Sequence, residues 1–145
     1  MNDQPIVFER TYKAPIEKVW KAITDPADMK QWYFDLPEFI PVVGCEFQFE
    51  GGPPNKTYLH LCKVTEVIPG RKIQYSWRYD GYDGNSLVTF ELFPEGDHTR
   101  LKLTHEGLET FPKENPDLAK ENFVQGWDEI TGTNLKDFLE KNNQE

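Results

Sequence analysis

Five consecutive stretches of alternating apolar and polar residues, between residues 44 and 105, place the strongest constraint on what this chain can fold into. The first reads CEFQFE at positions 45–50, so that Cys45, Phe47 and Phe49 share one face. A period of two is typical of a strand with one buried face. Turn clusters such as Gly-Gly-Pro-Pro-Asn separate it from further alternating stretches at residues 58–68, 72–79, 88–92 and 100–105. Strands joined by such short turns predict an antiparallel meander.

The N-terminal part predicts one more strand, at residues 6–12, and two short helices. Pro15 suits a first helical position, and apolar residues then recur at helical spacing: Ile16, Val19, Trp20 and Ile23. Asp25 and the proline after it end this helix and begin a second one, with Asp25 as its N-cap, to about Trp32. Residues 33–43 are aromatic and interrupted by prolines, which predicts a loop.

The C-terminal part predicts one long helix. Asn115-Pro116-Asp117 can cap it, and the helical pattern continues to about Lys141. At 100° per residue, one face collects Phe123, Val124, Trp127, Ile130, Leu135 and Phe138. A helix with one apolar stripe and a sheet with one apolar face bury these surfaces against each other. The predicted fold is therefore α+β, with a six-stranded antiparallel sheet, two short helices after the first strand and a long C-terminal helix.

Three small or polar residues interrupt this helix. Asn134 falls near the centre of the apolar stripe, so either it bonds a backbone carbonyl or it lines a hydrated pocket, since an unpaired amide there costs about 1–3 kcal/mol. Gly126 and Gly132 each weaken a helix by about 1 kcal/mol relative to alanine. We expect these glycines to permit close backbone packing, with a kink as the alternative.

Length and composition limit the class of protein. A chain of 145 residues has the length of one domain and buries enough surface to need no metal or disulfide. Although 37% of the residues are hydrophobic, 14% are aromatic, so the predicted core is built from large rings. The chain carries 25 acidic and 16 basic residues, a net charge of -9, which argues against nucleic acids and anionic membranes as partners.

The sequence also indicates a compartment. No apolar run is long enough for a transmembrane helix, and the N-terminus lacks the basic and apolar regions of a signal peptide. Cys45 and Cys62 form no CxxC pair. We expect a cytoplasmic protein with reduced thiols.

The order of these elements, with the motifs inside them, resembles the START-like (SRPBCC) superfamily over essentially the whole chain. The branch that it is most similar to is the C-terminal domain of the activator of heat shock protein 90 ATPase. The motifs that carry the resemblance are APIEKVW at residues 14–20, AITDP at 22–26, YSW at 75–77, LTHEG at 103–107 and Gly126-Trp127. The resemblance implies a helix-grip fold over residues 1–145, in which a curved sheet wraps around the C-terminal helix. It also implies a groove between helix and sheet that can hold an apolar small molecule.

A set of inward-facing side chains is predicted to line that groove. Buried Tyr and Trp rings need partners for their polar ends, and a layer with a few such groups is typical of a ligand pocket, although the same rings could simply form core. The candidates are Trp32, Phe47, Phe49, His60, Tyr75, Trp77, Phe90, Leu103, His105, Phe123, Trp127, Ile130 and Asn134.

Catalytic and metal-binding patterns are weak. His105 has the parity of its apolar neighbours and points inward, whereas the parity of His60 is ambiguous; each is either a hydrogen-bonded core histidine or a general base. No HxH, HExxH or CxxC motif exists, and the loop with Asp80 and Asp83 lacks the further ligands of a calcium loop. We therefore predict no metal, no cofactor and no catalytic residues.

Three functions are compatible with these observations. The first is a non-enzymatic domain that binds an apolar or amphipathic, lipid-like molecule between helix and sheet. The second, implied by the resemblance, is a chaperone-cofactor-like interaction domain with a role in the stress response. The third is a cyclase- or aldolase-like enzyme, for which His60 and His105 are the only candidate acid–base groups.

Overall fold

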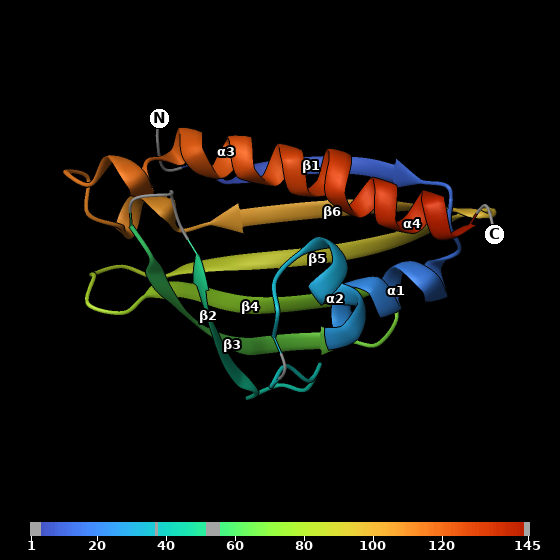
Figure 1. Cartoon of the computed structure of the whole chain (residues 1–145), viewed down its shortest axis with the longest axis horizontal. Helices are drawn as coiled ribbons and strands as arrows, with labels where there is room; N and C mark the ends of the chain where they lie inside the picture. Colours follow the sequence, from blue (N-terminus) through green and yellow to red (C-terminus); the bar gives the residue numbers. More distant parts are fainter. Residues whose placement is uncertain (1–3, 37, 52–55, 144–145) are drawn as a thin grey trace.

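A six-stranded antiparallel sheet runs through the structure, a computed structural model that describes residues 4–36, 38–51 and 56–143 (Figure 1). The strands are β1 (Ile6–Tyr12), β2 (Glu46–Gly51), β3 (Tyr58–Ile68), β4 (Lys72–Tyr79), β5 (Ser86–Glu95) and β6 (His98–Glu106). Their order in the sheet is β1-β6-β5-β4-β3-β2, so the meander is confirmed and the first strand closes it by pairing with the last. The turn predicted at residues 51–55 lies mostly outside the described residues.

The predicted alternation sets the buried face of the sheet. Strands β3 and β4 pair so that His60 lies opposite Tyr79 and Cys62 opposite Trp77, and all four side chains are buried. Their neighbours in sequence point to the other face, which is more exposed. The inner face of the sheet is therefore lined by rings, as the alternation predicts.

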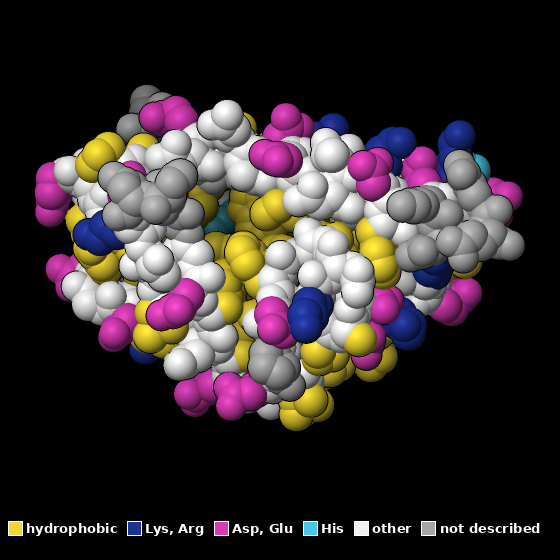
Figure 2. Space-filling view, viewed as in Figure 1, with side chains coloured by type: hydrophobic (Ala, Val, Ile, Leu, Met, Phe, Trp, Pro, Cys, Tyr) yellow, Lys and Arg dark blue, Asp and Glu magenta, His cyan; other side chains and the backbone are white. Residues whose placement is uncertain are grey.

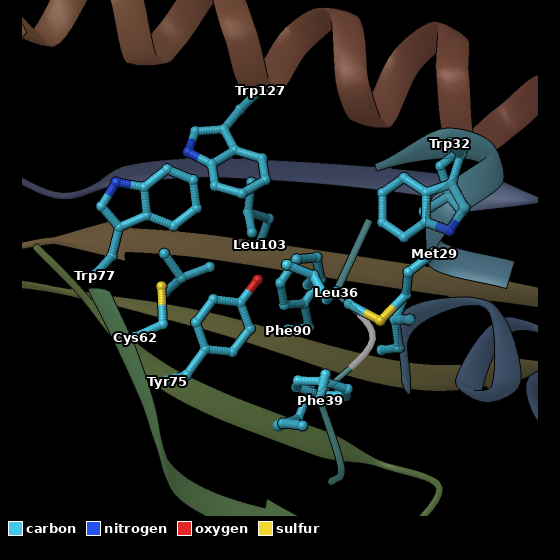
Figure 3. Packing of buried hydrophobic residues seen from close by; sticks show 14 of the residues in the cluster. Met29, Trp32, Leu36, Phe39, Cys62, Tyr75, Trp77, Phe90, Leu103 and Trp127 are labelled. Atoms are coloured by element: carbon cyan, nitrogen blue, oxygen red, sulfur yellow. The ribbon is translucent and has the colours of Figure 1, made fainter. Parts of the chain in front are cut away.

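Two short helices cover one end of this inner face. They are α1 (Ile16–Thr24) and α2 (Pro26–Trp32), and the Asp25 side chain caps α2 by accepting a hydrogen bond from the Asp28 backbone N–H. The loop that follows is not merely a surface connection, because Leu36 and Phe39 are buried in the core beside Met29 of α2 (Figure 3). This end of the groove is filled by side chains.

The predicted long C-terminal helix is confirmed, but it begins later than Pro116 and is not regular throughout. A short 3-10 turn η2 (Pro116–Leu118) precedes α3 (Lys120–Glu129). A π-helical segment η3 (Ile130–Asn134) then joins α3 to α4 (Leu135–Asn143). Another 3-10 turn, η1 (Leu108–Thr110), connects β6 to this region.

The π-helical segment changes which residues face the sheet. A π turn contains about one residue more than an α turn, so each later residue is rotated around the axis. The fully buried residues are accordingly spaced by four: Trp127, Thr131, Leu135 and Leu139. Asn134, predicted near the centre of the apolar stripe, is exposed, and so is Val124. Both predictions are wrong: Asn134 is rotated outward by the π turn, and Val124, which precedes that turn, lies outside the buried stripe of α3.

Strand β1 holds the π-helical segment in place. The Tyr12 hydroxyl donates a hydrogen bond to the carbonyl of Thr131 (2.7 Å), and the Thr131 hydroxyl bonds the Trp127 carbonyl (2.7 Å). The Arg10 guanidinium pairs with Asp128 and lies so close to Gly132 that a Cβ there would stand 3.2 Å from it. The close approach predicted for Gly132 is therefore observed, and its neighbour is a side chain of β1.

Two further observations concern the class of protein. Cys45 and Cys62 are both free thiols. No helix within the described ranges is long and apolar enough to cross a membrane.

The shifted register makes a testable prediction about Leu135 and Asn134. Leu135→Ala should lower the free energy of unfolding by about 2–5 kcal/mol, because it leaves a cavity under the helix. Asn134→Ala should change it by less than about 0.5 kcal/mol, because the side chain is exposed. Urea unfolding followed by circular dichroism measures both. A larger loss for Asn134→Ala than for Leu135→Ala would contradict the π-helical register.

Candidate functional site

A pocket opens between the first half of the C-terminal helix and the end of the sheet formed by β2, β3 and β4. Its volume is about 450 Å³. Its lining comes from the loop after α2 and from six elements, β2, β3, β4, η2, α3 and η3. The lining residues are Phe34, Gly51, Tyr58, His60, Trp77, Tyr79, Asp117, Leu118, Asn122, Phe123, Gly126, Trp127 and Ile130. In the space-filling view it is a hollow below α3, with a histidine and apolar side chains at its floor (Figure 2).

Aromatic rings form most of the wall. Trp127 reaches down from α3 toward Trp77 of the sheet, and their ring centroids lie 5.7 Å apart (Figure 3). On the opposite side Phe34 stacks on Phe49, with centroids 4.2 Å apart. Rings held in this way offer flat apolar surfaces to a ligand.

Gly126 keeps the helix side of the pocket open. It lies in the middle of α3, and a Cβ at this position would meet nothing within 4 Å. Our expectation of close backbone packing is therefore wrong for Gly126. The missing side chain leaves empty space over the sheet, next to Trp127 and Phe123.

His60 lies at the floor as a neutral imidazole. Its Nδ1 is 3.1 Å from the Tyr58 carbonyl, which can only accept, so Nδ1 carries a proton. Burial lowers the pKa of His60 to about 4. Hydrogen bonding to backbone carbonyls raises this pKa, but by less than burial lowers it. The single proton of the neutral ring is thus on Nδ1, and Nε2 keeps a lone pair. The ring stacks on Phe49, with centroids 4.3 Å apart.

The ring of Tyr79 lies beside this histidine, with centroids 4.7 Å apart, and its hydroxyl group has one partner among the described residues. Its oxygen accepts a hydrogen bond from the indole N–H of Trp77 (2.9 Å). The hydroxyl proton has no acceptor among the residues that the structure describes. Burial raises the pKa of Tyr79 well above its ordinary value, so the group stays protonated and can donate.

Among the described residues that line the pocket, one is acidic, and it lies at the mouth. Asp117 of η2 accepts a hydrogen bond from the Tyr58 hydroxyl (2.7 Å), which Asn115 also contacts (3.2 Å). The Asn122 side chain bonds the carbonyls of Pro116 and Asp117. These bonds hold the 3-10 turn at the rim of the pocket.

Five of the residues predicted from the sequence line this pocket: His60, Trp77, Phe123, Trp127 and Ile130. The other eight lie elsewhere: Phe49 is behind His60, Asn134 is exposed, and six belong to the closed core, namely Trp32, Phe47, Tyr75, Phe90, Leu103 and His105. Among these, Trp32 donates to the Ala22 carbonyl (2.9 Å), and Tyr75 shares a hydrogen bond with Tyr33 (2.7 Å).

Sequence reasoning missed several lining residues. Tyr58 and Tyr79 have the same strand parity as His60 and Trp77, so the alternation alone could have identified them. No local signal points to Phe34 or Asp117, because both come from irregular segments that only the fold brings to the pocket.

His105 is part of a closed chain of hydrogen bonds under Trp127. The indole N–H of Trp127 donates to Nδ1 of His105 (2.9 Å), so the ring proton is on Nε2 and bonds the Ser86 hydroxyl (2.8 Å). Ser86 in turn donates to the Trp77 carbonyl (2.7 Å). Burial lowers the pKa of His105 to about 3. Both ring nitrogens are engaged within the protein, which leaves none for proton transfer to a ligand.

We also searched the described residues for groups of side chains that could bind a metal ion. Within the part of the chain that the structure describes, no three His, Cys, Asp or Glu side chains are grouped so that they could hold an ion.

Comparisons with known proteins agree with this architecture. A family model described as activator of Hsp90 ATPase homolog 1-like protein matches residues 13–140. Protein MLL2253 from Mesorhizobium loti is 26% identical, with a TM-score of 0.76 over 95% of this chain and 98% of that chain. Protein CV1439 from Chromobacterium violaceum is 25% identical, with a TM-score of 0.78 over 97% and 99%. CalU16 from Micromonospora echinospora is 25% identical, with a TM-score of 0.72 over 92% and 73%. No curated protein sequence matches the chain significantly.

The neutral buried histidines predict that stability falls in mild acid. A histidine has a pKa near 6.5 when unfolded, whereas that of folded His105 is about 3, so the unfolded state binds the proton more tightly. The stabilisation is complete above pH 6.5 and is lost as the pH falls toward 3. At pH 5 the loss from His105 should be about 2 kcal/mol.

Urea unfolding at pH 7 and pH 5 measures this effect. In His105→Gln, whose amide can still bond Trp127 and Ser86, the loss between these pH values should be about 2 kcal/mol smaller than in the wild type. His98→Gln, at a partly exposed position, should keep the wild-type loss. An unchanged loss in His105→Gln would show that His105 is not held neutral.

Proposed function

Because this chain belongs to the family of activator of Hsp90 ATPase homolog 1-like proteins, we propose that it uses the fold of that family as a non-enzymatic small-molecule-binding domain. The ligand is apolar or amphipathic and occupies the pocket between α3 and the strands β2, β3 and β4. The confirmed helix-grip architecture supports a ligand-binding domain in general, and the features of the pocket support the narrower proposal.

Empty space beneath Gly126 is the observation that carries this proposal. A glycine in the middle of a helix costs about 1 kcal/mol relative to alanine. Here that glycine leaves open a pocket of about 450 Å³, a size that suits a small ligand. The other end of the groove, beneath α4, is filled by buried side chains such as Leu36 and Leu139. The selective opening of one end supports a binding role.

The groups in the pocket favour binding over catalysis. A general base works best with a pKa near the working pH, whereas the pKa of His60 is about 4. The buried thiol of Cys62 does not line the pocket, and burial raises its pKa far above the ordinary value. These properties weigh against the cyclase- or aldolase-like alternative.

A protein-interaction role is the second candidate, and one surface feature favours it. The loop before β2 exposes three apolar side chains, Ile40, Val42 and Val43, each 55–60% accessible. Exposed apolar groups close together are typical of surfaces that a partner covers. Capture of an Hsp90-type chaperone by the wild type, lost on Val42→Ser/Val43→Ser, would support this candidate, whereas an undiminished capture would argue against this surface.

The binding proposal predicts the effect of filling the pocket from Gly126. Gly126→Leu places a side chain in open space and removes a helix glycine, so the variant should be at least as stable as the wild type, by up to about 1 kcal/mol. It should also fail to retain a small molecule. Native mass spectrometry of protein purified from its own cells measures the bound mass, and thermal unfolding measures stability.

Val124→Leu is the matched control, since Val124 lies on the exposed face of the same helix. It should retain any bound molecule. A stoichiometric ligand that persists in Gly126→Leu would place the binding site elsewhere, and a wild-type protein that takes up no small molecule would contradict the proposal.

A further inference from the structure

The charges around the pocket restrict the ligand that it can take. None of its thirteen lining residues is Lys or Arg, and Asp117 at the mouth is the only one with a formal charge. A carboxylate or phosphate buried there would lose its hydration without gaining a cationic partner, and it would lie near a like charge. The pocket is therefore unfavourable for anionic amphiphiles such as fatty acids.

Lys56 is a candidate for an opposing cation, because it lies over the ring of the lining residue Tyr58, but it does not itself line the pocket. Its ammonium group lies over the rings of Tyr58 and Tyr82, 5.1 Å and 5.5 Å from their centroids. Tyr58 is part of the pocket wall, whereas Lys56 is not. An exposed ammonium outside the wall is screened by water and contributes little to the binding of a buried anion.

Two polar groups at the floor have hydrogen-bonding capacity that no partner among the described residues uses. The Tyr79 oxygen already accepts from Trp77, so its own proton is available to donate. Nδ1 of His60 holds the ring proton against the Tyr58 carbonyl, so Nε2 is available to accept. Both residues line the pocket, and their ring centroids are 4.7 Å apart. A hydroxyl group can satisfy both, because it accepts one hydrogen bond and donates another.

We propose, on the basis of the binding function above, that the pocket selects uncharged molecules with a hydroxyl group at one end of a flat apolar body. The hydroxyl bonds Tyr79 and His60, and the apolar body lies between the rings of Trp127 and Phe34. Phenols and alicyclic alcohols belong to this ligand class, and anionic lipids do not.

Three matched probes test this selectivity at pH 7 by isothermal titration calorimetry. They are 4-phenylphenol, which carries the hydroxyl, biphenyl, which lacks it, and biphenyl-4-carboxylate, which replaces it with a negative charge. The phenol should bind about fivefold more tightly than biphenyl, because it forms the two additional hydrogen bonds. It should bind at least about tenfold more tightly than the carboxylate, because a buried charge without a partner is costly.

Variants assign the selectivity to named groups. Tyr79→Phe should reduce the affinity for the phenol about twofold, because one of the two hydrogen bonds is lost and the bond to His60 remains, and it should change the affinity for biphenyl less than that for the phenol. Tyr82→Phe, a matched change outside the pocket, should alter neither affinity. Because Tyr79→Phe also removes the acceptor of Trp77, Asp117→Asn provides a second test: it should improve carboxylate binding severalfold relative to phenol binding, because it removes the negative charge at the mouth.

The outcomes separate this inference from the binding function itself. A carboxylate that binds as tightly as the phenol overturns the selectivity and leaves the pocket as a binding site. Equal affinities for the phenol and biphenyl show that the two polar groups at the floor do not select the ligand. If none of the three probes binds, both the binding function and the selectivity are wrong.

Discussion

The docking of Trp127 on the sheet is the interaction on which the rest of the structure depends. Its indole N–H begins a buried chain of hydrogen bonds through His105 and Ser86 to the carbonyl of Trp77. This chain crosses from the helix to three neighbouring strands, so it fixes how far the helix stands above the sheet and how it is rotated. The same ring forms a wall of the pocket. The group that anchors the helix therefore also sets the shape of the pocket.

The two ends of the groove differ because the π-helical segment changes the helical register between α3 and α4. Beneath α4, the π-helical segment turns Leu135 and Leu139 inward, where they close the core. Beneath α3, Gly126 and Trp127 face the sheet with empty space beside them. Tyr12 of β1 bonds the backbone of the π-helical segment, so the first strand of the chain helps to determine the register of the last helix. The core is therefore filled beneath α4, whereas the pocket opens beneath α3.

Much of the fold was predictable, and the errors in the site have specific causes. The strands were identified because alternation reports burial on each strand independently of the others. His60, Trp77, Phe123, Trp127 and Ile130 were placed in the site for the same reason, each from its own local period. Asn134 was misplaced because one π turn rotated it outward. Gly126 was misinterpreted because the sequence does not distinguish a glycine that allows close packing from one that leaves empty space.

The sequence by itself determined the element types, the inward faces of the strands and the layer that covers them, because these follow from the spacing of apolar residues along the chain. Only the tertiary structure decided the helix register and the place of the pocket. The bond between Tyr12 and Thr131 joins residues 119 positions apart, and the mouth joins Tyr58 to Asp117 across 59 positions. Local periodicity carries no information about which distant groups meet. The proton positions on His60 and His105 likewise depend on partners that only the folded chain supplies.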